Sequence, residues 1–113
     1  MSTLSTKKCV PCQGGVPPLP PDVIDLLLRE LDGWHAESGH HLPKEYKFPD
    51  FARALAFVNR LGAVAEEEGH HPDLFLSWGL VRVQIWTHKI DGLTESDFIL
   101  AAKIDALIPS ADG

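Results

Sequence analysis

The sequence predicts an α+β domain in the order α-β-β-α-β-β-α, with a four-stranded antiparallel sheet and helices packed on one face. Three segments repeat apolar residues at helical spacing, and two pairs of shorter segments have the pattern of β-hairpins. Helices beside a hairpin sheet must bury their apolar stripes against it. The chain of 113 residues fits one domain, expected at residues 22–113 behind a flexible leader at residues 1–21.

The leader is rich in glycine and proline. Two glycines and four prolines at residues 14–21 cannot sustain regular hydrogen-bonded structure. Deletion of residues 1–19 is therefore expected to leave folding and turnover nearly intact. The CVPC motif from Cys9 to Cys12 is half of a zinc site, a redox motif without its usual βαβ context, or part of a reduced leader, and we favour the last.

A first helix is predicted at about residues 21–31, followed by a hairpin. Gly33 stands where a helix is expected to stop. The helix stripe consists of Ile24, Leu27, Leu28 and Leu31. Ser38 and Gly39 then separate two strand-like segments, at residues 34–37 and 40–48.

The second helix is predicted to begin near Pro49, which suits a first-turn position, and to end at Gly69. Its apolar face is expected to contain Phe51, Leu55, Val58, Leu61 and Val64 or Ala65. Glycine readily takes the left-handed conformation after a helix, and Pro72 disfavours helical geometry at His71. The adjacent histidines therefore leave the helix.

The remaining elements are a second hairpin and a third helix. Strand-like segments lie at residues 74–78 and 80–88, and the second has aliphatic side chains on one face with His88 on the other. Thr94 and Asp97 match a capping box at the start of the last helix. Its predicted stripe is Phe98, Ala101, Ile104 and Ile108.

Composition and charge exclude several functions. The net charge is −6 without a cluster of lysine or arginine, which argues against direct nucleic-acid binding, although a protein partner that itself binds DNA stays open. No window has the length of apolar sequence that a membrane span needs, and no signal peptide follows the first residues. A cytoplasmic location is the resulting expectation.

The stretch EEEGHHPD at residues 66–73 contains the strongest candidates for catalytic residues. The negative end of a helix and its neighbouring carboxylates favour protonated imidazole, and Glu66 lies four residues before His70. A histidine that is protonated near neutral pH can donate a proton to a leaving group. With His88 from the strand end, three imidazoles can meet at one rim of the sheet.

Other interpretations stay open on chemistry alone. The histidine pair is also typical of a solvated helix end, and three histidines can hold zinc, although no HExxH signature is present. The second pair, His40 and His41, has no neighbouring carboxylate cluster and is expected to lie on the surface. The three tryptophans are more typical of core or interface than of ligand stacking.

The sequence resembles the pterin-4a-carbinolamine dehydratases, a family whose members also serve as dimerisation cofactors of a homeodomain transcription factor. The family signature is matched by Glu66, His70, His71, Pro72, Trp78, His88 and Asp97. The similarity extends from about Pro20 to Ile108 and leaves only the leader outside.

The resemblance implies a four-stranded sheet with helices on one face, a homodimer or tetramer, and no metal or organic cofactor. The implied activity is removal of water from 4a-hydroxytetrahydropterin, which gives quinonoid dihydropterin. It further implies that His70 and His88 act as acid and base and that His71 both binds the pterin and takes part in turnover. Glu66 is expected to orient His70, Asp97 to support the site, and Trp34 to lie near the pocket.

Two other functions compete with this one. Some relatives act as binding proteins in assembly or transcription, and those in Rubisco assembly have lost parts of the histidine pattern. This chain keeps the full pattern, which favours the enzyme. A zinc hydrolase needs a metal and gains no support from the resemblance.

Overall fold

The computed structural model describes residues 4–9 and 17–108. Its helices are α1 (Pro21–Leu28), α2 (Phe51–Glu68) and α3 (Glu95–Asp105), and its strands are β1 (Leu42–Lys47), β2 (Asp73–Ser77) and β3 (Leu80–Ile85). Two short 3-10 turns, η1 (Leu4–Thr6) and η2 (His88–Ile90), complete the fold. The expected α+β class with an antiparallel sheet is confirmed.

The described sheet has three strands in the order β1-β3-β2, so the prediction of four strands was wrong. The first segment of the predicted hairpin pairs only through the bridge between Glu37 and His41. Ser38 and Gly39 close this turn tightly with positive φ angles of 53° and 66°. Residues 34–36 before the bridge belong to no strand, and the buried Trp34 among them packs into the core.

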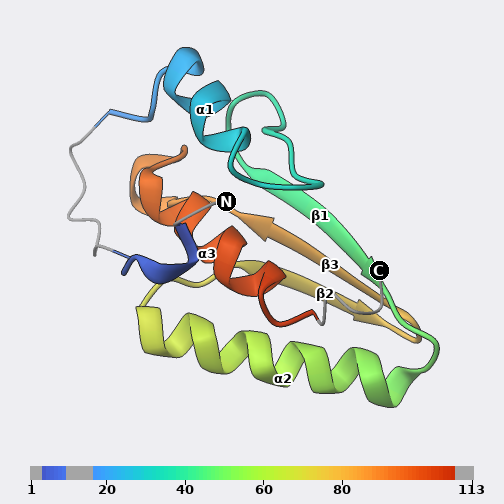
Figure 1. The fold of residues 1–113 in the computed structure, drawn as a ribbon. Helices are drawn as coiled ribbons and strands as arrows, with labels where there is room; N and C mark the ends of the chain where they lie inside the picture. Colours follow the sequence, from blue (N-terminus) through green and yellow to red (C-terminus); the bar gives the residue numbers. More distant parts are fainter. Residues whose placement is uncertain (1–3, 10–16, 109–113) are drawn as a thin grey trace.

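One face of the sheet is covered by helices. Val81, Val83 and Ile85 of β3 are fully buried, whereas Arg82 on the opposite face is exposed. Helices α2 and α3 contact β3 and each other, and α1 packs against α3. Figure 1 shows α2 and α3 lying across the strands, with α1 at the far end of the molecule.

Helix α2 ends at Gly69 as predicted, but Asp50 is its N-cap, so Pro49 lies before the helix and not in its first turn, and its buried face also differs. The Asp50 carboxylate accepts from the Arg53 backbone N–H at 2.8 Å, and Gly69 ends the helix with a φ of 65°. The buried side chains are Ala54, Phe57, Leu61, Ala65 and Glu68. Phe51 and Leu55, which were expected inside, are 43% and 39% exposed. Two overlapping sets of positions have helical spacing. The buried set includes Ala54, which the predicted face lacked, and Ala65, which it offered as the alternative to Val64.

Helix α3 is buried around most of its surface. The capping box of Thr94 and Asp97 is confirmed, and the predicted stripe is buried except at Ile108, which lies beyond the end of the helix. Residues 96–102 are all buried as well. The reason is that the 3-10 turn η1 covers the side of α3 that the sheet does not (Figure 1).

Residues 4–9 and Leu19, which belong to the predicted flexible leader, contact the folded domain. Leu4 is completely buried in the core, and Leu19 donates its backbone N–H to the Leu93 carbonyl at 2.9 Å. Cys12 lies outside the described residues, so the fate of the CVPC motif stays a prediction, as does the boundary at residue 21. Within the described ranges, no helix combines the length and apolar character needed to cross a membrane.

Candidate active site

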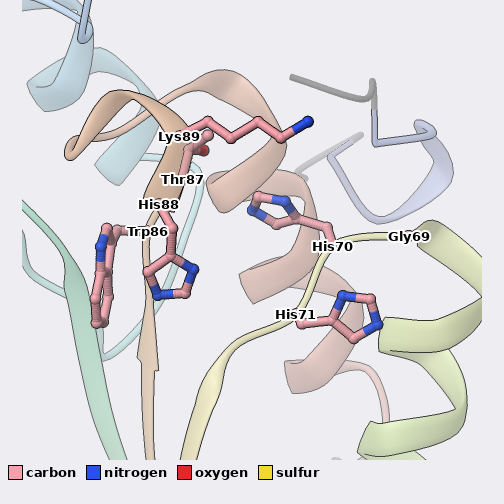
Figure 2. Close-up of a pocket in the computed structure, with 7 residues that line it drawn as sticks. All are labelled: Gly69, His70, His71, Trp86, Thr87, His88 and Lys89. Atoms are coloured by element: carbon pink, nitrogen blue, oxygen red, sulfur yellow. The ribbon is translucent and has the colours of Figure 1, made fainter. Parts of the chain in front are cut away.

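The two adjacent histidines begin a loop that leads from α2 into β2. Gly69 takes the left-handed conformation, and the His70 backbone N–H donates back to the Ala65 carbonyl at 3.1 Å. This closure reverses the chain, so the following side chains point across the end of the sheet. They line a cavity of about 260 Å³ together with residues 86–89, as Figure 2 shows.

His70 is fixed by a buried carboxylate. Its Nε2 lies 2.6 Å from Oδ1 of Asp97, whose side chain is completely buried, and only 13% of the His70 side chain is exposed. The other oxygen of Asp97 accepts from the Thr87 hydroxyl at 2.9 Å and from the Thr94 backbone N–H at 2.8 Å. Because a carboxylate only accepts hydrogen bonds, Nε2 of His70 carries the proton in this contact, and Nδ1 takes no part in the contact with Asp97.

His71 and His88 are more exposed than His70. His71 pairs through Nε2 with the Glu66 carboxylate, and its ring turns toward the end of α2 (Figure 2). The expectation that Glu66 orients His70 was therefore wrong, because Glu66 pairs with His71 instead. Across the cavity, the His88 ring stands edge-on to Trp86, with ring centroids 4.2 Å apart, and its Nε2 lies 3.7 Å from Asp73.

The pair His40 and His41 belongs to the surroundings of this site, which the sequence interpretation missed. Both rings pack on Trp86, with centroid distances of 5.3 and 5.8 Å, and His40 Nε2 lies 2.7 Å from the Asp91 carboxylate. Burial lowers the pKa of His41 below its ordinary value. The available signal was strand pairing: β1 starts at the residue opposite the end of β3, which brings residues 40 and 41 beside Trp86.

The other two tryptophans lie away from the cavity lining. Trp34 donates its indole N–H to the Asp105 carboxylate at 2.9 Å, beside Tyr46 and Lys44, so its expected place near the pocket finds no support in this geometry. Trp78 stands in the turn between β2 and β3 and is mostly exposed.

The part of the chain that the structure describes contains no group of three or more histidine, cysteine, aspartate or glutamate side chains arranged to hold a metal ion. The three-histidine zinc alternative therefore has no ligand set among those residues. The arrangement instead offers three imidazoles, each beside its own carboxylate, around one small cavity. Such pairs can hold, donate or accept protons.

The structure defines the class of protein: an α+β domain with a histidine-lined cavity at one end of the sheet. Comparison with known proteins identifies the family. The chain belongs to the pterin 4 alpha carbinolamine dehydratase family, whose model matches residues 17–107. A Rickettsia bellii protein named "Putative pterin-4-alpha-carbinolamine dehydratase" is 62% identical over 106 residues, covering 93% of this chain and 94% of that protein. A Rubrobacter xylanophilus protein of the same name is 53% identical over 107 residues, covering 95% of this chain and 100% of the relative.

Two solved structures share the fold. A Brucella melitensis protein described as a transcriptional coactivator/pterin dehydratase superposes with a TM-score of 0.77 at 33% identity, covering 81% of this chain and 99% of that one. A pterin dehydratase-like protein identified as a RuBisCO assembly factor in the alpha-carboxysome superposes with a TM-score of 0.58 at 27% identity, covering 67% and 89%. The resemblance drawn from the histidine signature is thereby confirmed at the level of the family.

Proposed function

We propose that this protein removes water from 4a-hydroxytetrahydropterin by histidine acid–base catalysis. The observation that carries the proposal is the convergence of His70, His71 and His88 on one cavity, with His70 held by a buried carboxylate. The cavity of about 260 Å³ is slightly smaller than the roughly 300 Å³ at which small-molecule sites usually begin, and the Trp86 ring adds a flat apolar wall. The family match supports a pterin as the ligand.

The reaction requires two proton transfers. One imidazolium gives a proton to the 4a-hydroxyl oxygen, the carbon–oxygen bond breaks, and water leaves. A neutral imidazole accepts the proton from the ring nitrogen, which yields quinonoid dihydropterin and balances the charge. His70 and His88 project from different elements toward the cavity, so we assign them to the two faces of the hydroxylated carbon, and His71 to pterin binding and turnover.

The test is the rate of dehydration of freshly generated 4a-hydroxytetrahydropterin, measured against its spontaneous rate. His70→Ala and His88→Ala are each expected to be partly impaired, and the double variant to fall much further, within the range of about 10²- to 10⁴-fold that a positioned acid or base contributes. His71→Ala is expected to be the most damaging single change. Exposed His35, which pairs with Glu37 outside the cavity, supplies the control His35→Ala.

A second function is favoured by the similarity to the RuBisCO assembly factor and to the protein described as a coactivator. In that case the protein acts as a binding partner, and the histidine variants leave its function intact. A double variant with the parent dehydration rate, or a parent no faster than the spontaneous reaction, would favour this alternative.

Self-association in the cytoplasm is part of the proposal, as a homodimer or tetramer. Phe51 and Leu55 on α2 and Leu74 and Phe75 on the edge strand β2 are exposed apolar side chains, which supports an interface between copies. Sedimentation of the purified chain measures the assembly. We propose catalysis without a metal or organic cofactor, since imidazoles alone can move both protons.

A further inference from the structure

Residues 4–9, here called the N-terminal strap, lie along α3 (Figure 1). Leu4 is fully buried in the core. The Lys103 ammonium of α3 donates to the Ser5 carbonyl at 3.0 Å, and Lys7 pairs with Glu95 at the start of the same helix at 3.0 Å. The strap is therefore attached at both ends of α3 by apolar packing and by polar contacts.

The strap also binds a buried carboxylate at the end of α2. The Cys9 backbone N–H donates to Oε1 of Glu68 at 2.9 Å, while Lys103 and Lys8 lie 3.5 and 3.9 Å from Oε2. Only 3% of the Glu68 side chain is exposed. The N–H of Cys9 lowers the pKa of Glu68 below its ordinary value, with Lys103 and Lys8 acting in the same direction. A buried carboxylate without these partners would be strongly unfavourable.

These contacts adjoin both members of the His70–Asp97 pair. Glu68 precedes His70 by two residues, with only the left-handed Gly69 between them. The Cys9 thiol donates to the carbonyl of Ser96, the residue before Asp97, at 3.5 Å. Figure 2 shows the strap beside the turn at Gly69. One segment thus contacts the chain immediately before the histidine and immediately before its carboxylate.

We propose that Glu68, bound by the strap, is a positioning residue that sets the distance between His70 and Asp97. The two residues sit on different elements, so their 2.6 Å contact depends on how the end of α2 is held against the start of α3. Glu68 joins these two elements through Lys103 of α3 and, by way of Cys9, through Ser96. The catalytic consequence rests on the proposed function, whereas the geometric consequence does not.

The test compares Glu68→Gln and a chain lacking residues 2–9 with the exposed neighbour variant Glu67→Gln. The first readout is the imidazole N–H proton resonance of His70, identified by its loss in His70→Ala. Both strap-disrupting changes are expected to shift or broaden this resonance below the melting temperature, and Glu67→Gln to leave it in place. The second readout is dehydration, where kcat is expected to fall about ten-fold with little change in KM, as for a misplaced catalytic group.

The two readouts separate the possible failures. A shifted resonance in a protein without dehydratase activity supports the positioning role and removes the proposed function. An unchanged resonance and kcat in Glu68→Gln, accompanied only by a lower melting temperature, would overturn the positioning role. If the shortened chain does not fold, Leu4→Ala in the full chain takes its place, with the same expected change in the His70 resonance.

Discussion

Truncation of Leu4 to alanine gives the most direct measure of how firmly the N-terminal strap belongs to the domain. The side chain is completely buried within the hydrophobic core, next to α3. Leu→Ala changes at buried sites cost about 2 to 5 kcal/mol, from lost transfer free energy and the cavity left behind. The strap contains only a three-residue 3-10 turn, so it can relax around the truncated side chain more easily than a long helix. We therefore expect a loss of about 2 to 3 kcal/mol, or roughly 8 to 15 °C in melting temperature.

The measurement is urea and thermal unfolding followed by circular dichroism, with Leu26→Ala as the matched control. Leu26 is 56% exposed in α1, where alanine is at least as good a helix former, so its replacement is expected to change stability by less than about 0.5 kcal/mol. Equal stabilities of the two variants would refute the reasoning. They would show that the strap contributes nothing to the core and that a dispensable leader, as first expected from the sequence, is the better description.

Two further predictions concern titrating groups at the strap. Burial, together with the neighbouring Glu68 carboxylate, raises the pKa of Cys9 to about 12, so at a pH below 9 its thiolate fraction is about a thousand-fold lower than for a thiol of pKa 9.0. In a Cys12→Ser background, alkylation of the folded protein is expected to be slower than that of the unfolded chain by about this factor, and an equal rate would contradict the burial. The pKa of Glu68 is lowered on folding, so its stabilising contribution is present above the ordinary carboxyl value of 4.5 and is lost as the pH falls through the folded-state pKa. Acid unfolding of Glu68→Gln is therefore expected to depend less steeply on pH than that of the parent, while Glu67→Gln follows the parent.

The sequence predicted two helix boundaries, the end of α2 and the start of α3, better than the helix faces and strand pairs. Gly69 and the Thr94–Asp97 capping box are local signals, because each depends on residues within one turn of the chain. The buried face of α2 and the missing fourth strand depend on what packs against them. The burial of Leu4 against α3 brings together residues nearly a hundred positions apart, and no periodic pattern in residues 1–21 predicts it.

The same difference separates the parts of the candidate site. The histidine motif and its exit from α2 could be read from the sequence, because a left-handed glycine followed by HHP reverses the chain. The carboxylate partners could not. Spacing of four residues brings side chains together only while the helix continues, and Gly69 ends it, so Glu66 reaches His71 instead of His70.

Asp97 links the start of α3 to the orientation of His70, because one oxygen completes the capping box and the other contacts the imidazole. Asp97→Ala removes both interactions and cannot tell helix stability from catalysis. Asparagine has nearly the same shape, and its single oxygen can keep the contact with Thr94 and Thr87 while its NH₂ group faces the ring. Nε2 of His70 must then accept rather than donate, which moves the ring proton to Nδ1. Asp97→Asn therefore preserves the cap and exchanges the tautomer, so a loss of dehydration without a loss of stability would identify the tautomer of His70 as the property that this carboxylate controls.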